Sequence, residues 1–185
     1  MSFFTSDRER RLWIWLLVAL VAIYSTLVLA RTLADMLGDY GFGVGLFMLG
    51  CLMVLAAVLT QGLSRRPAVA EVGIAIGIAA AYLFVFVRMS IVTERSHIIE
   101  YGVVAIIIFE ILQERVKQGR RISVPALLAI LLTTLVGAID ECIQLFIPSR
   151  IFDPIDIFFN FIAAVMAVTA SVALAWGRRK WGPSG

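Results

Sequence analysis

The feature that most constrains this chain is a series of long stretches without a charged side chain. Most of these stretches approach the roughly 20 residues that a helix needs to cross the hydrocarbon core of a bilayer. They are residues 12–30, 42–64, 72–87, 122–139 and 157–177. None alternates polar and apolar residues as the strands of a membrane barrel do. The pattern therefore predicts helices that have lipid as their solvent.

A further helix is predicted over residues 97–112, although only nine residues separate Glu100 from Glu110. Helices that line a polar interior tolerate acids that lipid-facing helices do not. Glu110 is expected to be interfacial and solvated. The sequence thus predicts an all-α integral membrane bundle of about six transmembrane helices, with residues 1–185 forming a single transmembrane domain.

The basic residues predict the orientation of this bundle. With six helices, twelve of the sixteen basic residues fall on the face that holds both termini. Short basic loops stay on the cytoplasmic side, so the N and C termini are predicted to be cytoplasmic. The net charge of +3 is spread over short loops and the C-terminal end. This distribution favours membrane lipids as partners, and no nucleic-acid partner is predicted.

Polar residues gather at the opposite, outer ends of the last three predicted helices. Spacings of three, four and seven residues recur among them, so members of one group can share a helix face. We therefore predict a polar pocket beneath the outer membrane surface. Its nine candidates are His97, Glu100, Tyr101, Asp140, Glu141, Gln144, Arg150, Asp156 and Asn160.

The depth of two of these acids is informative. If Ser123 caps the fifth span, with Pro125 in the first turn, a crossing of about 20 residues ends near Gln144. Asp140 and Glu141 then lie within the outer leaflet, where an unpaired carboxylate costs about 3 kcal/mol on insertion scales. Arg150 can serve as their counter-ion or can bind a substrate anion, and the sequence leaves both roles open.

The chemistry of the pocket is less constrained than its position. Asp153 before Pro154 has the order of an N-cap and a first-turn proline, and Asp156 then suits the helix dipole, so both acids also fit a structural role. With one histidine and no HExxH or paired-cysteine spacing, neither a metal nor a cofactor is predicted. No catalytic residue is assigned, because Ser96 and Cys142 lack an activating context.

At these same residues the chain resembles the VanZ-like family of small bacterial membrane proteins, over about residues 89–170. The motifs are His97-x-x-Glu100-Tyr101, Asp140-Glu141-x-x-Gln144, Pro148-x-Arg150, Asp156 and Asn160. The resemblance implies a multi-pass protein of the bacterial cytoplasmic (inner) membrane with a role at the cell envelope. The founding member of the family is associated with resistance to the antibiotic teicoplanin, a glycopeptide, without an agreed reaction.

Three features depart from the family pattern. Ser149 stands where the family usually has glycine, and Glu94 stands where it has a basic residue. Alanines follow Asn160 where the family has glycines, at positions 163, 164 and 167. The alanines are expected to keep the helix packable. Glu94 reverses a charge beside the predicted pocket, so the ligand can differ from that of relatives.

Two functions compete on this sequence. In the first, the polar pocket binds, and in an enzymatic version modifies, an envelope lipid or a cell-wall-related molecule. In the second, the chain is a non-catalytic accessory subunit that packs against a larger membrane protein complex, and the polar residues only hold three helices in register. The sequence leaves open whether the chain is an enzyme.

Overall fold

The computed structural model describes residues 4–37, 69–88, 92–146 and 152–181. These residues form helices, with no β-strand among them, and the all-α prediction is confirmed. The helices are α1 (Asp7–Leu37), α3 (Val69–Arg88), α4 (Val92–Lys117), α5 (Pro125–Gln144) and α6 (Pro154–Trp181). The apolar stretch 42–64, predicted as the second span, lies outside the described residues.

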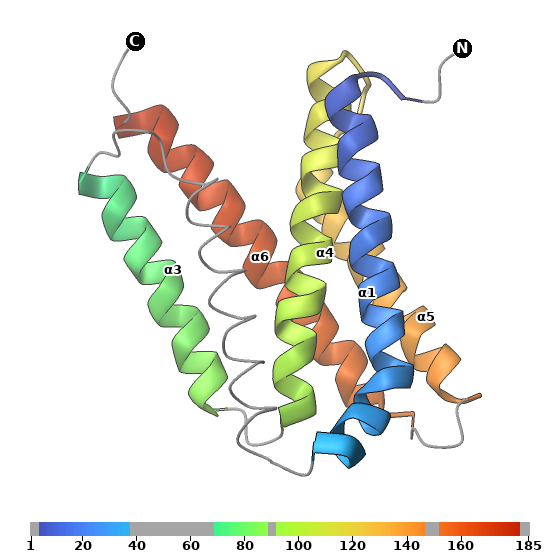
Figure 1. Ribbon diagram of the computed structural model, residues 1–185. Helices are drawn as coiled ribbons and strands as arrows, with labels where there is room; N and C mark the ends of the chain where they lie inside the picture. The colour runs from blue at the N-terminus through green and yellow to red at the C-terminus, as the bar shows by residue number, and fades with distance from the viewer. Residues whose placement is uncertain (1–3, 38–68, 89–91, 147–151, 182–185) are drawn as a thin grey trace.

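Helices α4 and α6 organise the fold. α4 contacts α1, α5 and α6, whereas α6 contacts α3, α4 and α5. Figure 1 shows that α6 runs obliquely, so that it lies beside α4 and α5 near its start and beside α3 farther along. The start of α1 and the end of α6 lie at one end of the bundle, and the end of α5 and the start of α6 lie at the other.

Small residues let these helices approach closely. Ala163, Ala164 and Ala167 of α6 are all buried. A Cβ added at Gly102 of α4 would meet the Cβ of Ala167 at 3.9 Å, an ordinary contact distance. Small side chains at helix crossings are typical of membrane bundles, because they allow the backbones to pack side by side.

The start of α5 differs from the prediction. Val124, not Ser123, holds the N-cap position, and no side chain caps the helix. Pro125 occupies the first turn, where its fixed φ and missing N–H are tolerated. Because the helix begins directly at this proline, Ser123 is one residue too early to cap it. The predicted end at Gln144 agrees with the structure.

Two of the described helices, α5 and α6, are long and apolar enough to cross a bilayer. The apolar part of α3, Val72–Tyr82, is shorter. The segment 97–112 lies within α4, as a helix was predicted there. The count of six spans and the cytoplasmic location of both termini stay predictions.

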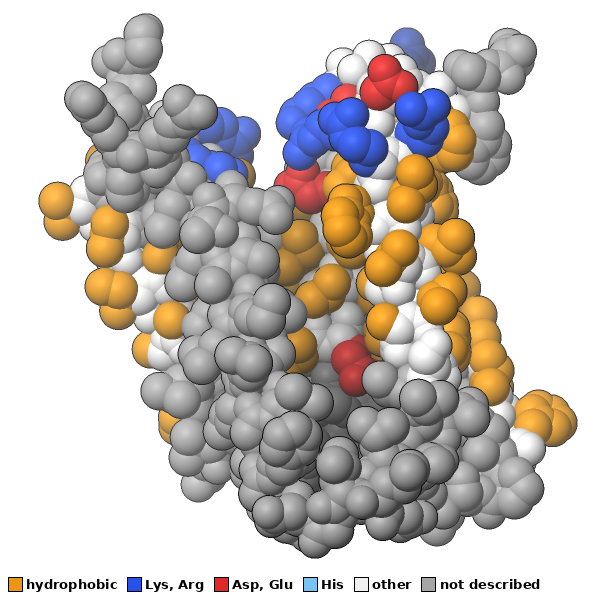
Figure 2. Space-filling model, viewed as in Figure 1, with side chains coloured by type: hydrophobic (Ala, Val, Ile, Leu, Met, Phe, Trp, Pro, Cys, Tyr) orange, Lys and Arg blue, Asp and Glu red, His pale blue; other side chains and the backbone are white. Residues whose placement is uncertain are grey.

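Basic and hydrophobic side chains occupy different parts of the bundle surface. Figure 2 shows basic side chains gathered where α1 begins and α6 ends, with hydrophobic side chains along the flanks. On α5 every fourth residue is an exposed leucine or isoleucine, namely Leu127, Leu131, Leu135, Ile139 and Ile143. A continuous apolar stripe of this kind suits contact with hydrocarbon better than contact with water.

Candidate functional site

Helix α5 carries two acids and an amide that are buried together near its C-terminal end. Asp140, Glu141 and Gln144 are all buried. The Gln144 Nε2 donates hydrogen bonds to Glu141 Oε1 at 3.2 Å and to Asp140 Oδ2 at 3.4 Å. One amide therefore holds both carboxyl groups on the buried face of the helix.

The same acids reach the start of α6. The Asp153 backbone N–H donates to Glu141 Oε2 at 3.2 Å, and Asp153 Oδ1 accepts from the Ile155 N–H at 2.8 Å. Asp153 thus caps α6, which confirms the structural interpretation of this residue. Asp156 lies in the first turn and is partly exposed. The hydrogen bonds of Glu141 and Asp153 tie the end of α5 to the beginning of α6.

Helices α4 and α1 contribute tyrosines beside this cluster. Tyr101 of α4 is buried. The carboxyl group of Asp140 lies close enough to interact electrostatically with Tyr101 and with Tyr24 of α1. Glu100, the neighbour of Tyr101, is partly exposed. Asp140 is therefore surrounded by polar groups from three helices.

Asn160 of α6 is the most unusual member of the site. Its side chain is 0% exposed, and in the described part of the chain neither its Nδ2 nor its Oδ1 has a hydrogen-bond partner. The buried hydroxyl of Thr133 on α5 likewise has none there. A buried polar group without a partner costs about 1–3 kcal/mol. Such groups require an explanation, and an absent ligand or water is one.

Gly137 explains how Asn160 fits against α5. A Cβ added at Gly137 would lie 2.5 Å from Asn160 Nδ2 and 2.8 Å from Asn160 Cβ, which is too close. The glycine therefore leaves the space that the amide occupies. Gly137 lies one turn before Asp140 on the buried face of α5, so Asn160 adjoins the acidic cluster.

The structure thus brings five of the nine predicted residues to the junction of α4, α5 and α6. These five are Tyr101, Asp140, Glu141, Gln144 and Asn160, and all are buried. Glu100 and Asp156 are partly exposed. The side chain of His97 and the whole of Arg150 lie outside what the structure describes. No group of three His, Cys, Asp or Glu residues able to hold a metal ion occurs among the described residues.

Two members of the junction, Thr133 and Gly137, were not predicted from the sequence. Their signal is the spacing along α5, where positions 133, 137, 140 and 144 follow the period of one helix face. The pattern is visible in the sequence once the polar residues at 140 and 144 are extended backwards by two turns. Neither residue type suggested a site by itself.

A second polar cluster joins α1 to α4 at the opposite end of the bundle. Glu9 is 0% exposed, and its Oε1 accepts from Arg115 Nε at 2.7 Å. Its Oε2 accepts from the Thr5 backbone N–H at 2.7 Å and from the Thr5 hydroxyl at 2.6 Å. The Trp13 Nε1 donates to Oε1 at 3.2 Å. Both oxygens of this buried carboxylate are therefore satisfied.

Arg8 completes this second cluster. Its guanidinium contacts Glu110 Oε2 at 2.7 Å and Glu114 Oε2 at 3.1 Å. The Ser6 hydroxyl donates to the other oxygen of Glu114 at 2.8 Å. Glu110 is 35% exposed, so it is partly solvated as expected, but the prediction missed its ion pair.

These partners stabilise the ionised form of two acids. Burial alone would raise the pKa of Glu9, but hydrogen bonds from Thr5, Arg115 and Trp13 outweigh it and lower the pKa from 4.5 to about 2. The hydroxyl of Ser6, followed by Gln118 and Arg8, lowers the pKa of Glu114. Both acids lie outside the predicted spans. The cluster is a clamp of paired charges, which we call the α1–α4 clamp.

Two described helices of bilayer length and a polar junction buried among helices are features typical of one class, the α-helical membrane proteins. Within it, the chain belongs to the VanZ/LLP1 family, whose sequence model matches residues 3–175. The match includes α1 and α3, so the likeness extends well beyond residues 89–170. A search of curated proteins and a search of solved structures found no match.

Proposed function

We propose that this chain is a multi-pass protein of the bacterial inner membrane whose polar junction binds the head group of an envelope lipid or a cell-wall-related molecule. The junction comprises Tyr101, Thr133, Asp140, Glu141, Gln144 and Asn160. In this proposal it lies on the extracytoplasmic side, because basic side chains, which favour the cytoplasmic side, gather at the opposite end of the bundle, where α1 begins and α6 ends. A role in glycopeptide resistance follows as part of the proposal from family membership.

The observation that carries the proposal is the buried amide of Asn160. A polar network that serves only to hold helices in register satisfies its own donors and acceptors. In the junction, Gln144 and the Asp153 backbone N–H donate hydrogen bonds to the acids. The side chains of Asn160 and Thr133, in contrast, have no hydrogen-bond partner among the described residues. A ligand that forms hydrogen bonds with Asn160 and Thr133 would remove the free-energy cost of leaving their buried polar atoms without partners.

The hydrogen-bonding groups of Asn160 and Thr133 restrict the chemical class of ligand that the junction can bind. An amide offers two donors and an acceptor, and a hydroxyl offers one donor and two acceptor lone pairs. Hydroxyl and amide groups of a ligand match both, as sugars and peptides do. The buried acids nearby can accept further hydrogen bonds from such groups. A hydroxyl- or amide-bearing head group therefore fits the junction better than a purely anionic one.

The decisive experiment compares two glutamates at opposite ends of the bundle. Glu141→Gln removes an acid from the junction but keeps its size and one of its two acceptor oxygens, and Glu110→Gln is the matched control on the α1–α4 clamp. Each variant is expressed at equal level in a responsive bacterial host, and teicoplanin susceptibility and envelope lipid composition are measured. We expect Glu141→Gln to lose the effect of the wild-type protein and Glu110→Gln to keep it.

Two results would count against this function. If Glu141→Gln matched the wild-type protein in both measurements, the junction would not be the working site. If the protein were recovered from membranes in fixed stoichiometry with another chain, and the junction variants changed only that recovery, the accessory-subunit function would be favoured.

A further inference from the structure

The turn between α4 and α5 presents basic side chains to the surroundings of the bundle. Lys117, Arg120 and Arg121 are all exposed. Gly119 closes the end of α4, because its φ of 85° lets its N–H donate to a backbone carbonyl of the last turn at 3.0 Å. Three cationic residues therefore lie within five positions, with Cα atoms at most about 15 Å apart. We call residues 117–121 the basic turn.

The acids of the neighbouring α1–α4 clamp do not neutralise the basic turn. Glu9 pairs with Arg115, and Arg8 pairs with both Glu110 and Glu114. Among the described residues, the three cationic side chains of the basic turn form no ion pair and no side-chain hydrogen bond. The basic turn therefore carries positive charge that the described chain leaves uncompensated.

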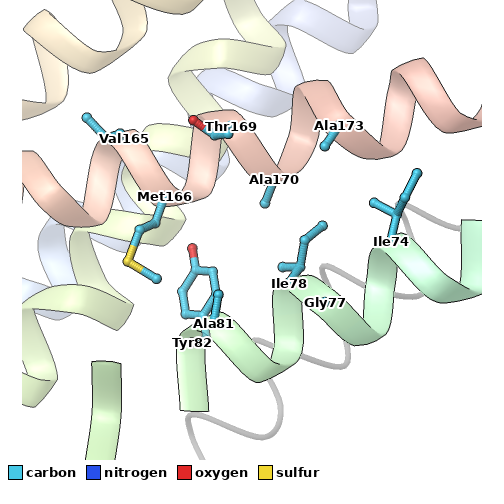
Figure 3. Close-up of a pocket in the computed structure, with 10 residues that line it drawn as sticks. All are labelled: Ile74, Gly77, Ile78, Ala81, Tyr82, Val165, Met166, Thr169, Ala170 and Ala173. Carbon is cyan, nitrogen blue, oxygen red and sulfur yellow. The ribbon is translucent and has the colours of Figure 1, made fainter. Parts of the chain in front are cut away.

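Two other features of the structure are less suited to an anion. At the end of α6, the ammonium group of Lys180 lies 5.0 Å from the ring centroid of Trp176 and 4.9 Å from that of Trp181, so aromatic faces already attract it. A pocket of about 400 Å³ lies between α3 and α6, where side chains of the two helices face each other (Figure 3). Its lining is apolar apart from the neutral hydroxyl groups of Tyr82 and Thr169. Neither feature offers an uncompensated cation.

The basic turn lies next to a helix of bilayer length. The twenty residues of α5 extend over about 30 Å, which is the thickness of the hydrocarbon core, so Pro125 lies at a boundary of the core when α5 spans the bilayer. Only three residues separate Arg121 from Pro125, at most about 14 Å of extended chain. The polar head groups occupy a layer of about 5–8 Å on each side of the core. The basic turn is therefore within reach of lipid head groups.

We infer that Arg120 and Arg121 bind the phosphate group of an anionic phospholipid in the adjacent leaflet. A guanidinium group is planar and can donate two parallel hydrogen bonds to phosphate oxygens. Lys117 lies in the last turn of α4, where the helix dipole already favours a cation, so its role is supporting. This site goes beyond the function proposed above, because it lies at the opposite end of the bundle from the polar junction.

Two arginines at the same end of the bundle allow a matched test. Arg121→Gln removes a charge without a partner among the described residues, and Arg10→Gln removes a charge that is paired with Asp7 at 3.6 Å. The full chain is purified in micelles of a neutral detergent and titrated with phosphatidylglycerol, and with phosphatidylcholine as the lipid without net charge. Native mass spectrometry counts the lipid molecules bound to each chain.

We expect Arg121→Gln to bind phosphatidylglycerol about fivefold more weakly than the wild type, and Arg10→Gln less than about twofold more weakly. Binding of phosphatidylcholine should be equal in all variants, which also shows that each is folded. Equal losses of phosphatidylglycerol binding in the two variants would overturn the inference, because the general positive charge of this end of the bundle would then suffice.

The geometry of the contact is tested with Arg121→Lys, which keeps the charge but loses the paired hydrogen bonds of the guanidinium group. We expect binding of phosphatidylglycerol to weaken by about twofold to threefold, and binding equal to that of the wild type would overturn the guanidinium contact. Displacement of the lipid by an equal concentration of inorganic phosphate would overturn the lipid as the ligand, since a soluble phosphate would then be preferred. Recovery of the wild type from membranes with an acidic protein that Arg121→Gln releases, in place of phospholipid, would overturn it as well.

Discussion

The two ends of the bundle differ in whether their buried polar side chains have hydrogen-bond partners. At the end that carries the termini, Glu9 is fully buried but both of its oxygens accept hydrogen bonds, and Arg115 supplies the countercharge. At the other end, Asn160 is equally buried, yet its amide has no hydrogen-bond partner among the described residues. Among the described residues, the buried carboxylate of Glu9 has its partners, whereas the buried amide of Asn160 has none.

This difference distinguishes the end of the bundle that stabilises the fold from the end that we propose binds a ligand. Paired and hydrogen-bonded charges join α1 to α4, and removal of one partner leaves the other uncompensated. Unsatisfied polar groups lower stability, so they persist where a protein uses them for another purpose. We therefore assign a structural role to the α1–α4 clamp and the ligand-binding role to the polar junction.

The largest effect on stability is expected from Arg115→Ala. This change leaves the carboxylate of Glu9 buried without its countercharge, a defect that costs about 3–5 kcal/mol in fully buried pairs. Because Arg115 is 30% exposed, we expect about 3 kcal/mol. The measurement is denaturant unfolding in mixed micelles. Arg10→Ala is the control, since its pair with Asp7 is exposed and should contribute less than about 1 kcal/mol. If Arg115→Ala and Arg10→Ala lowered the free energy of unfolding equally, the α1–α4 clamp would contribute no more to stability than an exposed ion pair does.

The α1–α4 clamp should also make stability depend on pH. Glu9 has a pKa of about 2 in the folded chain and 4.5 as its ordinary value, so its contribution is complete above pH 4.5 and is lost as the pH falls towards 2. The shift corresponds to a contribution on the order of 3 kcal/mol. Unfolding of the wild type and Glu9→Gln is compared across this window. The stability difference between them should shrink on acidification, and a constant difference would refute the assignment.

A smaller loss is expected where α5 meets α6. Gly137→Ala places a Cβ against Asn160, and overpacking of this kind costs about 1–3 kcal/mol. Gly102→Ala is the matched control, because its nearest contact would be 3.9 Å, and it should be neutral or slightly stabilising. Combining Gly137→Ala with Asn160→Ala should recover only part of the loss, since the Cβ of residue 160 remains 2.8 Å away. If the effects of Gly137→Ala and Asn160→Ala on the free energy of unfolding were simply additive, this would show that α5 and α6 move apart freely to make room for the added Cβ.

The sequence predicted one end of the molecule better than the other. Helical spacing of polar residues within apolar stretches identified Asp140, Glu141, Gln144 and Asn160, because the period of a helix is a local property. The helix over residues 97–112 was also predicted, despite Glu100 and Glu110, since its remaining residues are apolar. Local patterns sufficed for these features.

The α1–α4 clamp was not predicted, for a physical reason. Glu9 stands in a charged segment that resembles a solvated cytoplasmic end, and its partner Arg115 is 106 residues away in sequence. No local pattern encodes such a pair, because it depends on how α1 and α4 pack. The space at Gly137 is similar, since only the packing of α6 shows that a Cβ there would meet Asn160.

The smallest effect on stability, and the most informative, is expected from Asn160→Ala. The change removes two buried polar atoms that have no partner among the described residues, a gain of about 1–3 kcal/mol, but it leaves a cavity that offsets much of this gain. The free energy of unfolding should therefore stay within about 1 kcal/mol of the wild type, while the effect on teicoplanin susceptibility and envelope lipids is lost. A register-holding residue would show the reverse, with stability lost and the cellular effect falling only as the amount of folded protein falls. Measuring unfolding, protein level and susceptibility on the same variant separates the two roles, because a ligand contact can be removed without unfolding the bundle that presents it.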